Sequence, residues 1–212
     1  MDSRISTATE FVKKELGSAE AGHDWWHIQR VRKNALEIAK GEKVDLLVME
    51  LAALLHDIGD AKFHDGNETI GPKRVQEFLD QIELLEEQKL HILNIVKFIS
   101  FKGGHNEGKF DSPEFRIVQD ADRLDALGAI GIARAFSYGG HKGRIFYDPA
   151  IPPSMNMSRE EYKSSTAPTI NHFYEKLLLL KDLMKTSRGR EIAEERHDFM
   201  LQFLDQFYKE WG

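Results

Sequence analysis

A histidine and an aspartate, His56 and Asp57, stand side by side at the end of the apolar stretch LVMELAALLHDIGD. Ionisable groups are rarely buried at the end of an apolar helix unless they are paired or bind a metal. Three further residues could complete a site: His27 in an earlier helical pattern, Asp60 shortly after the pair, and Asp122 in the run FRIVQDADRLDALGA. Together these side chains could hold a metal ion and activate a water molecule.

Four of these residues, His27, His56, Asp57 and Asp122, would form a mixed nitrogen and oxygen site. Such a site suits Mn, Fe, Co, Ni or Zn better than Ca, which prefers oxygen ligands alone. Adjacent helical residues point about 100° apart, so His56 and Asp57 could share a metal only at the helix end. Two more helices would have to converge there, and Asp60 would be placed to take a proton from a bound water. Spacing alone does not assemble these residues.

Composition excludes several other classes of protein. The chain has no cysteine, so a disulfide framework and a cysteine-ligated zinc site are both ruled out. Its net charge of −6 argues against binding to a nucleic acid polymer, which requires many cations to neutralise phosphates. The first residues contain no apolar signal core, and no apolar run is long enough to cross a bilayer. We therefore expect a cytoplasmic protein without a membrane partner.

Helical periodicity dominates the chain, and we find no strand pattern or internal repeat. We expect helices near residues 5–16, 27–38, 45–57, 72–79, 91–100, 112–129, 173–184 and 199–211. Asp24 and Asp45 are expected to cap the second and third of these helices. The Gly- and Pro-rich residues 138–165 are expected to form a loop region, which would follow a site core at about residues 20–137 and precede closing helices at about 166–211.

The order His27, then His56-Asp57, then Asp122 resembles the H…HD…D signature of the HD-domain metal-dependent phosphohydrolases. The stretches GHDWWHIQRV, LLHDIGDAKFH, QDADRLDALGAIGIARAF and YGGHKGRIFYDP resemble one bacterial branch of that family, the nucleotide pyrophosphohydrolase-like proteins. The similarity covers nearly the whole chain. An isolated HD pair is a weak signal, whereas the four-part set in matching helical contexts is a specific one.

The resemblance implies that residues 1–212 form a single all-α domain, a helical bundle of the HD-domain type with the metal site in the bundle. It implies that His27, His56, Asp57 and Asp122 bind a divalent metal ion. Manganese is the expected ion, with Co, Ni, Fe, Zn or Mg as alternatives. In related proteins an acidic residue three positions after the motif aspartate assists the attacking water, and Asp60 stands there.

The activity that the resemblance implies is hydrolysis of nucleoside or deoxynucleoside triphosphates to monophosphate and pyrophosphate. A nucleoside-monophosphate phosphatase or a phosphodiesterase of the same superfamily is the alternative enzyme, and a non-catalytic nucleotide or metal sensor is the alternative of another class. Family members that hydrolyse guanosine tetraphosphate carry an acidic pair after the HD motif. Here Asp60 is followed by Ala61, which argues against that activity. The wide apolar helices could also support a homodimer.

Four cationic side chains are candidate phosphate contacts. Lys62 follows the motif closely, Lys102 precedes two glycines, and Lys142 and Arg144 lie in the run GGHKGR. Glycines expose backbone amides, and amides together with cations suit polyphosphate. The ordinary alternative is that these lysine and arginine side chains are simply solvated.

Two neighbouring sets of residues leave more than one reading open. Asp120 and Asp125 flank Asp122, and Asp125 lies one helical turn away, so we assign Asp125 to the substrate or to support of the ligands and Asp120 to structure. The adjacent Trp25 and Trp26 could stack on a nucleobase, although packing in the core is the more ordinary role for at least one of them.

Overall fold

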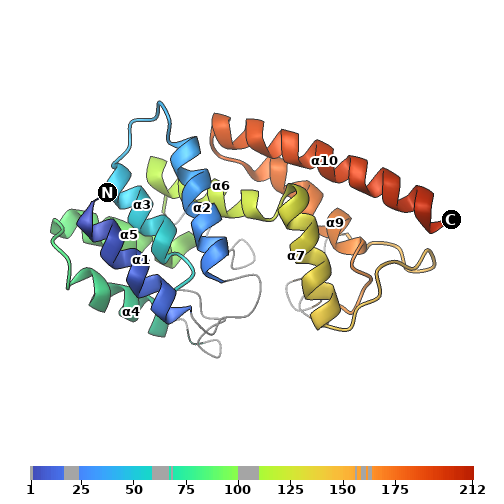
Figure 1. Ribbon diagram of the computed structural model, residues 1–212, viewed down its shortest axis with the longest axis horizontal. Helices are drawn as coiled ribbons and strands as arrows, with labels where there is room; N and C mark the ends of the chain where they lie inside the picture. The colour runs from blue at the N-terminus through green and yellow to red at the C-terminus, as the bar shows by residue number, and fades with distance from the viewer. Residues whose placement is uncertain are drawn as a thin grey trace. The chain divides into compact units, whose positions relative to one another are not determined.

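The computed structural model describes residues 2–16, 24–58, 67, 69–99, 110–155, 157–158, 161 and 164–212. Within these ranges all regular secondary structure is helical (Figure 1). The contacts divide the chain into two compact units, Met1–Ala121 and Asp122–Gly212. Among the described helices, none combines the length and the apolar character that crossing a bilayer requires.

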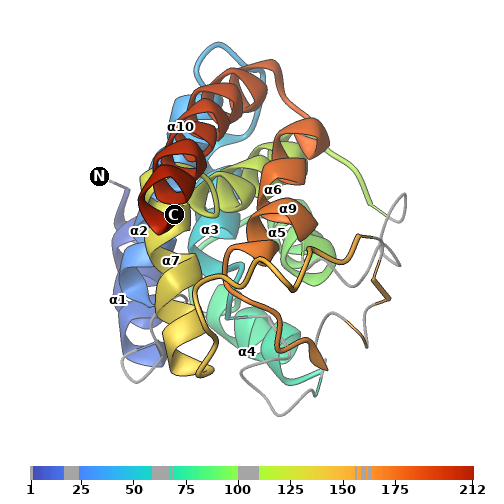
Figure 2. The same cartoon turned by 90° about the vertical axis from the view of Figure 1, so that its right-hand side faces the viewer.

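The first unit contains α1 (Ser3–Glu15), α2 (Trp25–Ile38), α3 (Leu46–Leu55), α4 (Ile70–Leu79), α5 (Glu86–Ile99) and most of α6 (Pro113–Asp125). Helix α3 lies at its centre, in contact with α1, α2 and α5, while α4 packs on α5 (Figures 1 and 2). Residues 48–55 of α3 are buried apart from Glu50. Each buried leucine contributes roughly 1.5–3 kcal/mol, so the apolar run before His56 forms the core of this unit.

Side-chain caps fix where α2 and α3 begin. The carboxylate of Asp24 accepts a hydrogen bond from the backbone N–H of His27 at 2.9 Å. The carboxylate of Asp45 accepts from the N–H groups of Leu47 at 3.0 Å and Val48 at 3.1 Å. Both aspartates thereby satisfy backbone donors that a helix N-terminus would otherwise leave unpaired. The two predicted caps are confirmed.

The second unit contains α7 (Gly128–His141), α9 (Asn171–Glu175), the 3₁₀ helix η2 (Leu177–Leu183) and α10 (Ser187–Trp211). Helix α10 packs on α7 and η2, and α9 packs on η2. An aromatic cluster joins these elements. The Phe136 ring of α7 lies 6.1 Å from the ring of Phe173 and 6.0 Å from that of Phe203, centroid to centroid. These are ordinary distances for aromatic packing, so α10 is held by its apolar face.

Several expected helix ranges are wrong. The helix expected at 112–129 is two helices, because α6 ends at Asp125 and α7 begins at Gly128, and the helix expected at 199–211 already begins at Ser187. Helix α7 continues to His141, so the loop expected from residue 138 begins later. A Cβ on Gly139 would lie only 2.2 Å from the hydroxyl oxygen of buried Thr169, so close packing requires glycine inside this helix. The expected helix at 173–184 is instead α9 followed by η2. The division into a site core, a loop region and closing helices stays a prediction.

Candidate metal centre

His27 comes from the first turn of α2. Its side chain is fully buried, and its backbone N–H is held by the cap from Asp24. Side chains in an α-helix tilt toward the N-terminus, so the imidazole extends past the start of α2 rather than along its length. The cap therefore fixes the position from which the His27 ring reaches the candidate site.

His56 and Asp57 follow directly on the end of α3. The C-cap residue His56 keeps helical backbone angles, with φ −58° and ψ −40°. Its Nδ1 lies 2.8 Å from the carbonyl oxygen of Ala53. Because a carbonyl oxygen only accepts hydrogen bonds, Nδ1 carries the hydrogen, and this assigns Nε2 as the nitrogen that can bind a metal. Metal-binding histidines are commonly oriented by such a bond on their other nitrogen.

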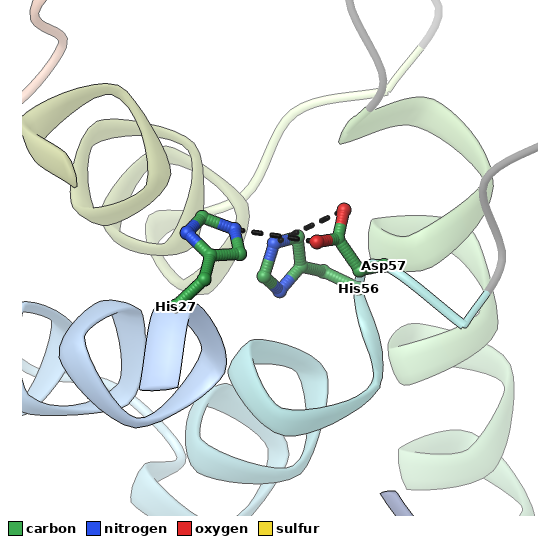
Figure 3. A group of neighbouring side chains, drawn as sticks. All are labelled: His27, His56 and Asp57. Atoms are coloured by element: carbon green, nitrogen blue, oxygen red, sulfur yellow. Dashed lines mark ion pairs between the residues drawn. The ribbon is translucent and has the colours of Figure 1, made fainter. Parts of the chain in front are cut away.

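The three side chains converge on one buried point (Figure 3). The Nε2 atom of His27 lies 3.3 Å from one carboxylate oxygen of Asp57, and Nε2 of His56 lies 3.6 Å from the other. One possible ligand atom from each residue lies within 4.8 Å of the others. The two imidazole rings meet edge to face, with centroids 5.4 Å apart.

This donor set fits a divalent transition metal. Asp57 is 5% exposed and His56 3% exposed, so the carboxylate lies in a low-dielectric environment. A carboxylate in such surroundings is stable when it is paired or binds a metal. Two imidazole nitrogens and a carboxylate oxygen are ligands that zinc, manganese, iron, cobalt and nickel accept. We conclude that His27, His56 and Asp57 could hold such an ion.

Within the residues that it describes, the structure does not add the other predicted residues to this cluster. Asp122 lies in α6, is partly buried and belongs to the second unit, so its role as fourth ligand stays a prediction. Asp60, Lys62 and Lys102 lie outside the described residues.

Asp125, at the end of α6, has a defined ion-pair partner. Its carboxylate accepts a hydrogen bond from the guanidinium of Arg134 at 2.6 Å, and the same nitrogen of Arg134 lies 3.2 Å from the backbone carbonyl oxygen of Asp125. Asp125 is 1% exposed, so this ion pair compensates a buried charge. A contact between Asp125 and the substrate stays a prediction.

Lys142 and Arg144 share an aromatic neighbour. The Lys142 ammonium lies 5.7 Å and the Arg144 guanidinium 5.6 Å from the ring centroid of Tyr138. Arg144 also donates a hydrogen bond to the backbone carbonyl of Ser165 at 2.6 Å. Arg144 is thus tied to the chain segment that follows, whereas Lys142 is exposed at the end of α7. Their contacts with phosphate stay predictions.

Sequence reasoning missed two arginines that fix the junction between α6 and α7. Arg134 pairs with Asp125, and Arg196 of α10 donates a hydrogen bond to the carbonyl of Leu124 at 2.5 Å. The Arg196 side chain also covers Gly128, whose φ of +70° favours glycine. Burial lowers the pKa of Arg196, and the nearby Asp125 opposes that shift. The glycine was a possible signal for the turn, but nothing in the pattern indicated its arginine cover.

Comparison with known proteins decides the family. The HD domain family model matches residues 25–127, which include His27, His56 and Asp57. YpgQ of Bacillus subtilis (strain 168) is 41% identical over 204 residues, which cover 94% of this chain and 90% of YpgQ. This chain belongs to the HD-domain family. The family resemblance and the all-α HD-type fold expected from the sequence are confirmed.

Solved structures of HD proteins extend the likeness over the whole chain. An HD-superfamily hydrolase from Bacillus thuringiensis is 44% identical and superposes with a TM-score of 0.78, covering 99% of this chain and 97% of that one. The crystal structure of Bacillus subtilis YpgQ in complex with ADP gives a TM-score of 0.76 at 35% identity, covering 98% of this chain and 95% of YpgQ. The candidate metal centre therefore lies in a fold that these related proteins share over almost their whole length.

Proposed function

We propose that this chain is a divalent-metal-dependent phosphohydrolase that acts on nucleotides. The observation that carries the proposal is the buried convergence of His27, His56 and Asp57. The Bacillus thuringiensis relative, an HD-superfamily hydrolase, supports a hydrolytic role for this site. The ADP complex of YpgQ supports a nucleotide as the substrate class.

The specific reaction that we propose converts a nucleoside or deoxynucleoside triphosphate to the monophosphate and pyrophosphate. Water attacks the α-phosphorus, the bond from that phosphorus to the oxygen bridging the α- and β-phosphates breaks, and pyrophosphate leaves. The proton of the attacking water passes to Asp60, which follows the motif aspartate by three positions. This choice of bond rests on the resemblance to nucleotide pyrophosphohydrolases.

In this scheme His27, His56 and Asp57 hold the metal, with Asp122 as the proposed fourth ligand. A bound divalent ion supplies Lewis-acid polarisation of phosphate and makes water more acidic. The hydrogen bond from His56 to Ala53 keeps the imidazole in the tautomer that a ligand needs. Manganese is the proposed ion, and Co, Ni, Fe, Zn and Mg are the alternatives.

The remaining predicted residues would bind the substrate. Lys62, Lys102, Lys142 and Arg144 would neutralise the negative charge of the phosphates, because ammonium and guanidinium groups make charge-assisted hydrogen bonds with phosphate oxygens. Asp125 would contact the substrate while Arg134 holds its carboxylate in place.

The proposal is tested by measuring which products the protein forms from a panel of nucleotides. Purified protein is incubated with Mn²⁺ and each nucleoside triphosphate, and monophosphate, phosphate and pyrophosphate are separated by ion chromatography. We expect equimolar monophosphate and pyrophosphate from the wild type, and a loss of at least 100-fold in turnover for Asp57→Asn. Loss of a residue that only supports a metal ligand typically costs about 10- to 100-fold, and loss of the ligand itself should cost at least as much. Asp205→Asn is the matched control, because Asp205 is exposed on α10 and forms an ion pair with Lys209 one helical turn away.

Metal content is measured on the same proteins by elemental analysis, so that the site is tested apart from activity. Equal turnover and equal manganese content in wild type and Asp57→Asn would sink the proposed centre. Free phosphate from monophosphates, or opening of a phosphodiester, would assign the site to the alternative enzymes. Tight nucleotide binding without product under any divalent ion would favour a sensor.

A further inference from the structure

The two adjacent tryptophans at the start of α2 have different surroundings. The Trp25 ring is partly buried and covered by Lys13 of α1, whose ammonium lies 4.8 Å from the ring centroid. Trp26 is 65% exposed, the largest value among the exposed large apolar side chains of the described residues. Exposed indole is unusual, because tryptophan gains much of its stabilisation from burying its ring. The sequence repeats one residue type, but only the first copy packs in the fold.

Trp26 stands directly before the metal-ligating candidate His27. Both belong to the first turn of α2, and side chains in that turn tilt toward the helix N-terminus. The indole and the imidazole therefore leave the same end of the helix about 100° apart around its axis, from Cα atoms about 3.8 Å apart. An exposed aromatic side chain is thus adjacent in sequence to a buried ligand candidate.

We infer that Trp26 stacks on the nucleobase of the substrate, an inference that rests on the proposed nucleotide hydrolysis. A nucleotide bound through its phosphates at the metal centre carries its base outward from that centre, and every base has a flat π-face. Indole stacks on such a face without reading hydrogen-bonding groups. Trp26 then adds affinity for the nucleoside part while accepting all four bases, and discrimination between bases would have to come from other residues.

Stacking predicts a specific kinetic change. Base–aromatic stacking is worth roughly 1–3 kcal/mol by substitution, which corresponds to about 5- to 100-fold in affinity. We expect Trp26→Leu to raise KM for ATP, GTP, CTP and UTP at least 5-fold each with kcat held within about 2-fold. Trp26→Phe, which keeps an aromatic face, should recover most of the affinity. Trp211→Phe is the control, because Trp211 is also an exposed tryptophan but lies at the end of α10 in the second unit.

Two further measurements separate stacking from a structural role. Manganese content of Trp26→Leu should equal that of wild type, and inhibition by inorganic tripolyphosphate, which has no base, should change less than about 2-fold. An equal weakening of tripolyphosphate and nucleotide, or unchanged KM in Trp26→Leu, overturns the inference. A self-association that Trp26→Leu abolishes, with no effect on nucleotide affinity, overturns it as well by assigning the ring to a protein contact.

Fluorescence makes the test independent of turnover. Nucleotide added with Ca²⁺ in place of Mn²⁺ should quench the tryptophan emission of wild type and of Trp211→Phe, and Trp26→Phe should lose most of that quenching. Quenching that is absent in wild type, or unchanged in Trp26→Phe, refutes stacking. If no nucleotide is hydrolysed with any metal but nucleotide still quenches the Trp26 fluorescence, the proposed reaction is wrong. The inferred contact between Trp26 and the base is then still supported.

Discussion

His172 of α9 should make the protein less stable in mild acid. Burial, and then the positive charges of Lys176 and Arg144, lower the pKa of this imidazole from 6.5 to about 4. The unfolded chain therefore binds a proton at His172 at a higher pH than the folded chain does. Stability from this group is complete above pH 6.5 and declines as pH falls toward 4, because protonation then favours the unfolded state.

The size of the effect follows from the two pKa values. A pKa shift of one unit corresponds to about 1.4 kcal/mol, so the full loss below pH 4 is about 3 kcal/mol. At pH 5, where the unfolded imidazole is almost fully protonated and the folded one mostly neutral, the loss is about 2 kcal/mol. This is a large share of the 5–15 kcal/mol that typically separates folded and unfolded states.

Urea unfolding at pH 8 and pH 5 measures this loss in wild type and His172→Gln. Other groups also titrate, so the relevant quantity is the difference between the two proteins. Wild type should lose about 2 kcal/mol more than His172→Gln between these pH values. An NMR titration of the imidazole, assigned by its absence in the variant, should show a midpoint near 4. Equal losses, or a midpoint above 6, would refute the reasoning.

Three other outcomes are expected. Gly139→Ala should lower the free energy of unfolding by about 1–3 kcal/mol, because its Cβ would meet the Thr169 hydroxyl oxygen at 2.2 Å. Adding Thr169→Ala to this variant should restore part of the lost stability. An unchanged melting temperature in Gly139→Ala would contradict the expected collision. Arg134→Met should lower the free energy of unfolding, measured in urea, by about 1–3 kcal/mol, because buried Asp125 then loses the Arg134 guanidinium that lies 2.6 Å away. A decrease of less than about 0.5 kcal/mol would show that this ion pair contributes little to stability. Removing metal with a chelator should lower the melting temperature of wild type, and adding Mn²⁺ at about 100 times its Kd should return about 2.7 kcal/mol. Asp57→Asn should show no such return, and an equal return would place the ion elsewhere.

Local signals predicted the parts of the fold that position the ligand candidates. Asp24 and Asp45 indicated where α2 and α3 begin, because short polar side chains cap helices through contacts within a few residues. The apolar run before His56 indicated a buried helix, and α3 is such a helix. The three described ligand candidates follow from these two helices, since one lies in the first turn of α2 and two directly follow α3. Local chemistry therefore indicated the two helix ends, whereas only the family resemblance grouped His27 with His56 and Asp57.

Tertiary packing decided the parts that the sequence did not predict. The glycines near the end of α7 favour a loop by propensity, yet α7 continues through Gly139, where a Cβ would collide with Thr169, a residue 30 positions later. The apolar positions Leu177 and Leu180 are three residues apart, a spacing that fits both α-helix and 3₁₀ helix, so periodicity could not distinguish η2 from a continued α-helix.

The His56 hydrogen bond explains why the histidine–aspartate pair lies at a helix end. The last carbonyls of a helix have no intrahelical partner, and the carbonyl of Ala53 in α3 accepts from Nδ1 of His56. One contact therefore satisfies a backbone acceptor and orients the imidazole with Nε2 toward Asp57, 3.6 Å away. Within a helix the same carbonyl would bond to a backbone N–H, and the ring would lose this restraint. The sequence shows a histidine here, but the end of the helix determines which of its nitrogens would be available to bind a metal.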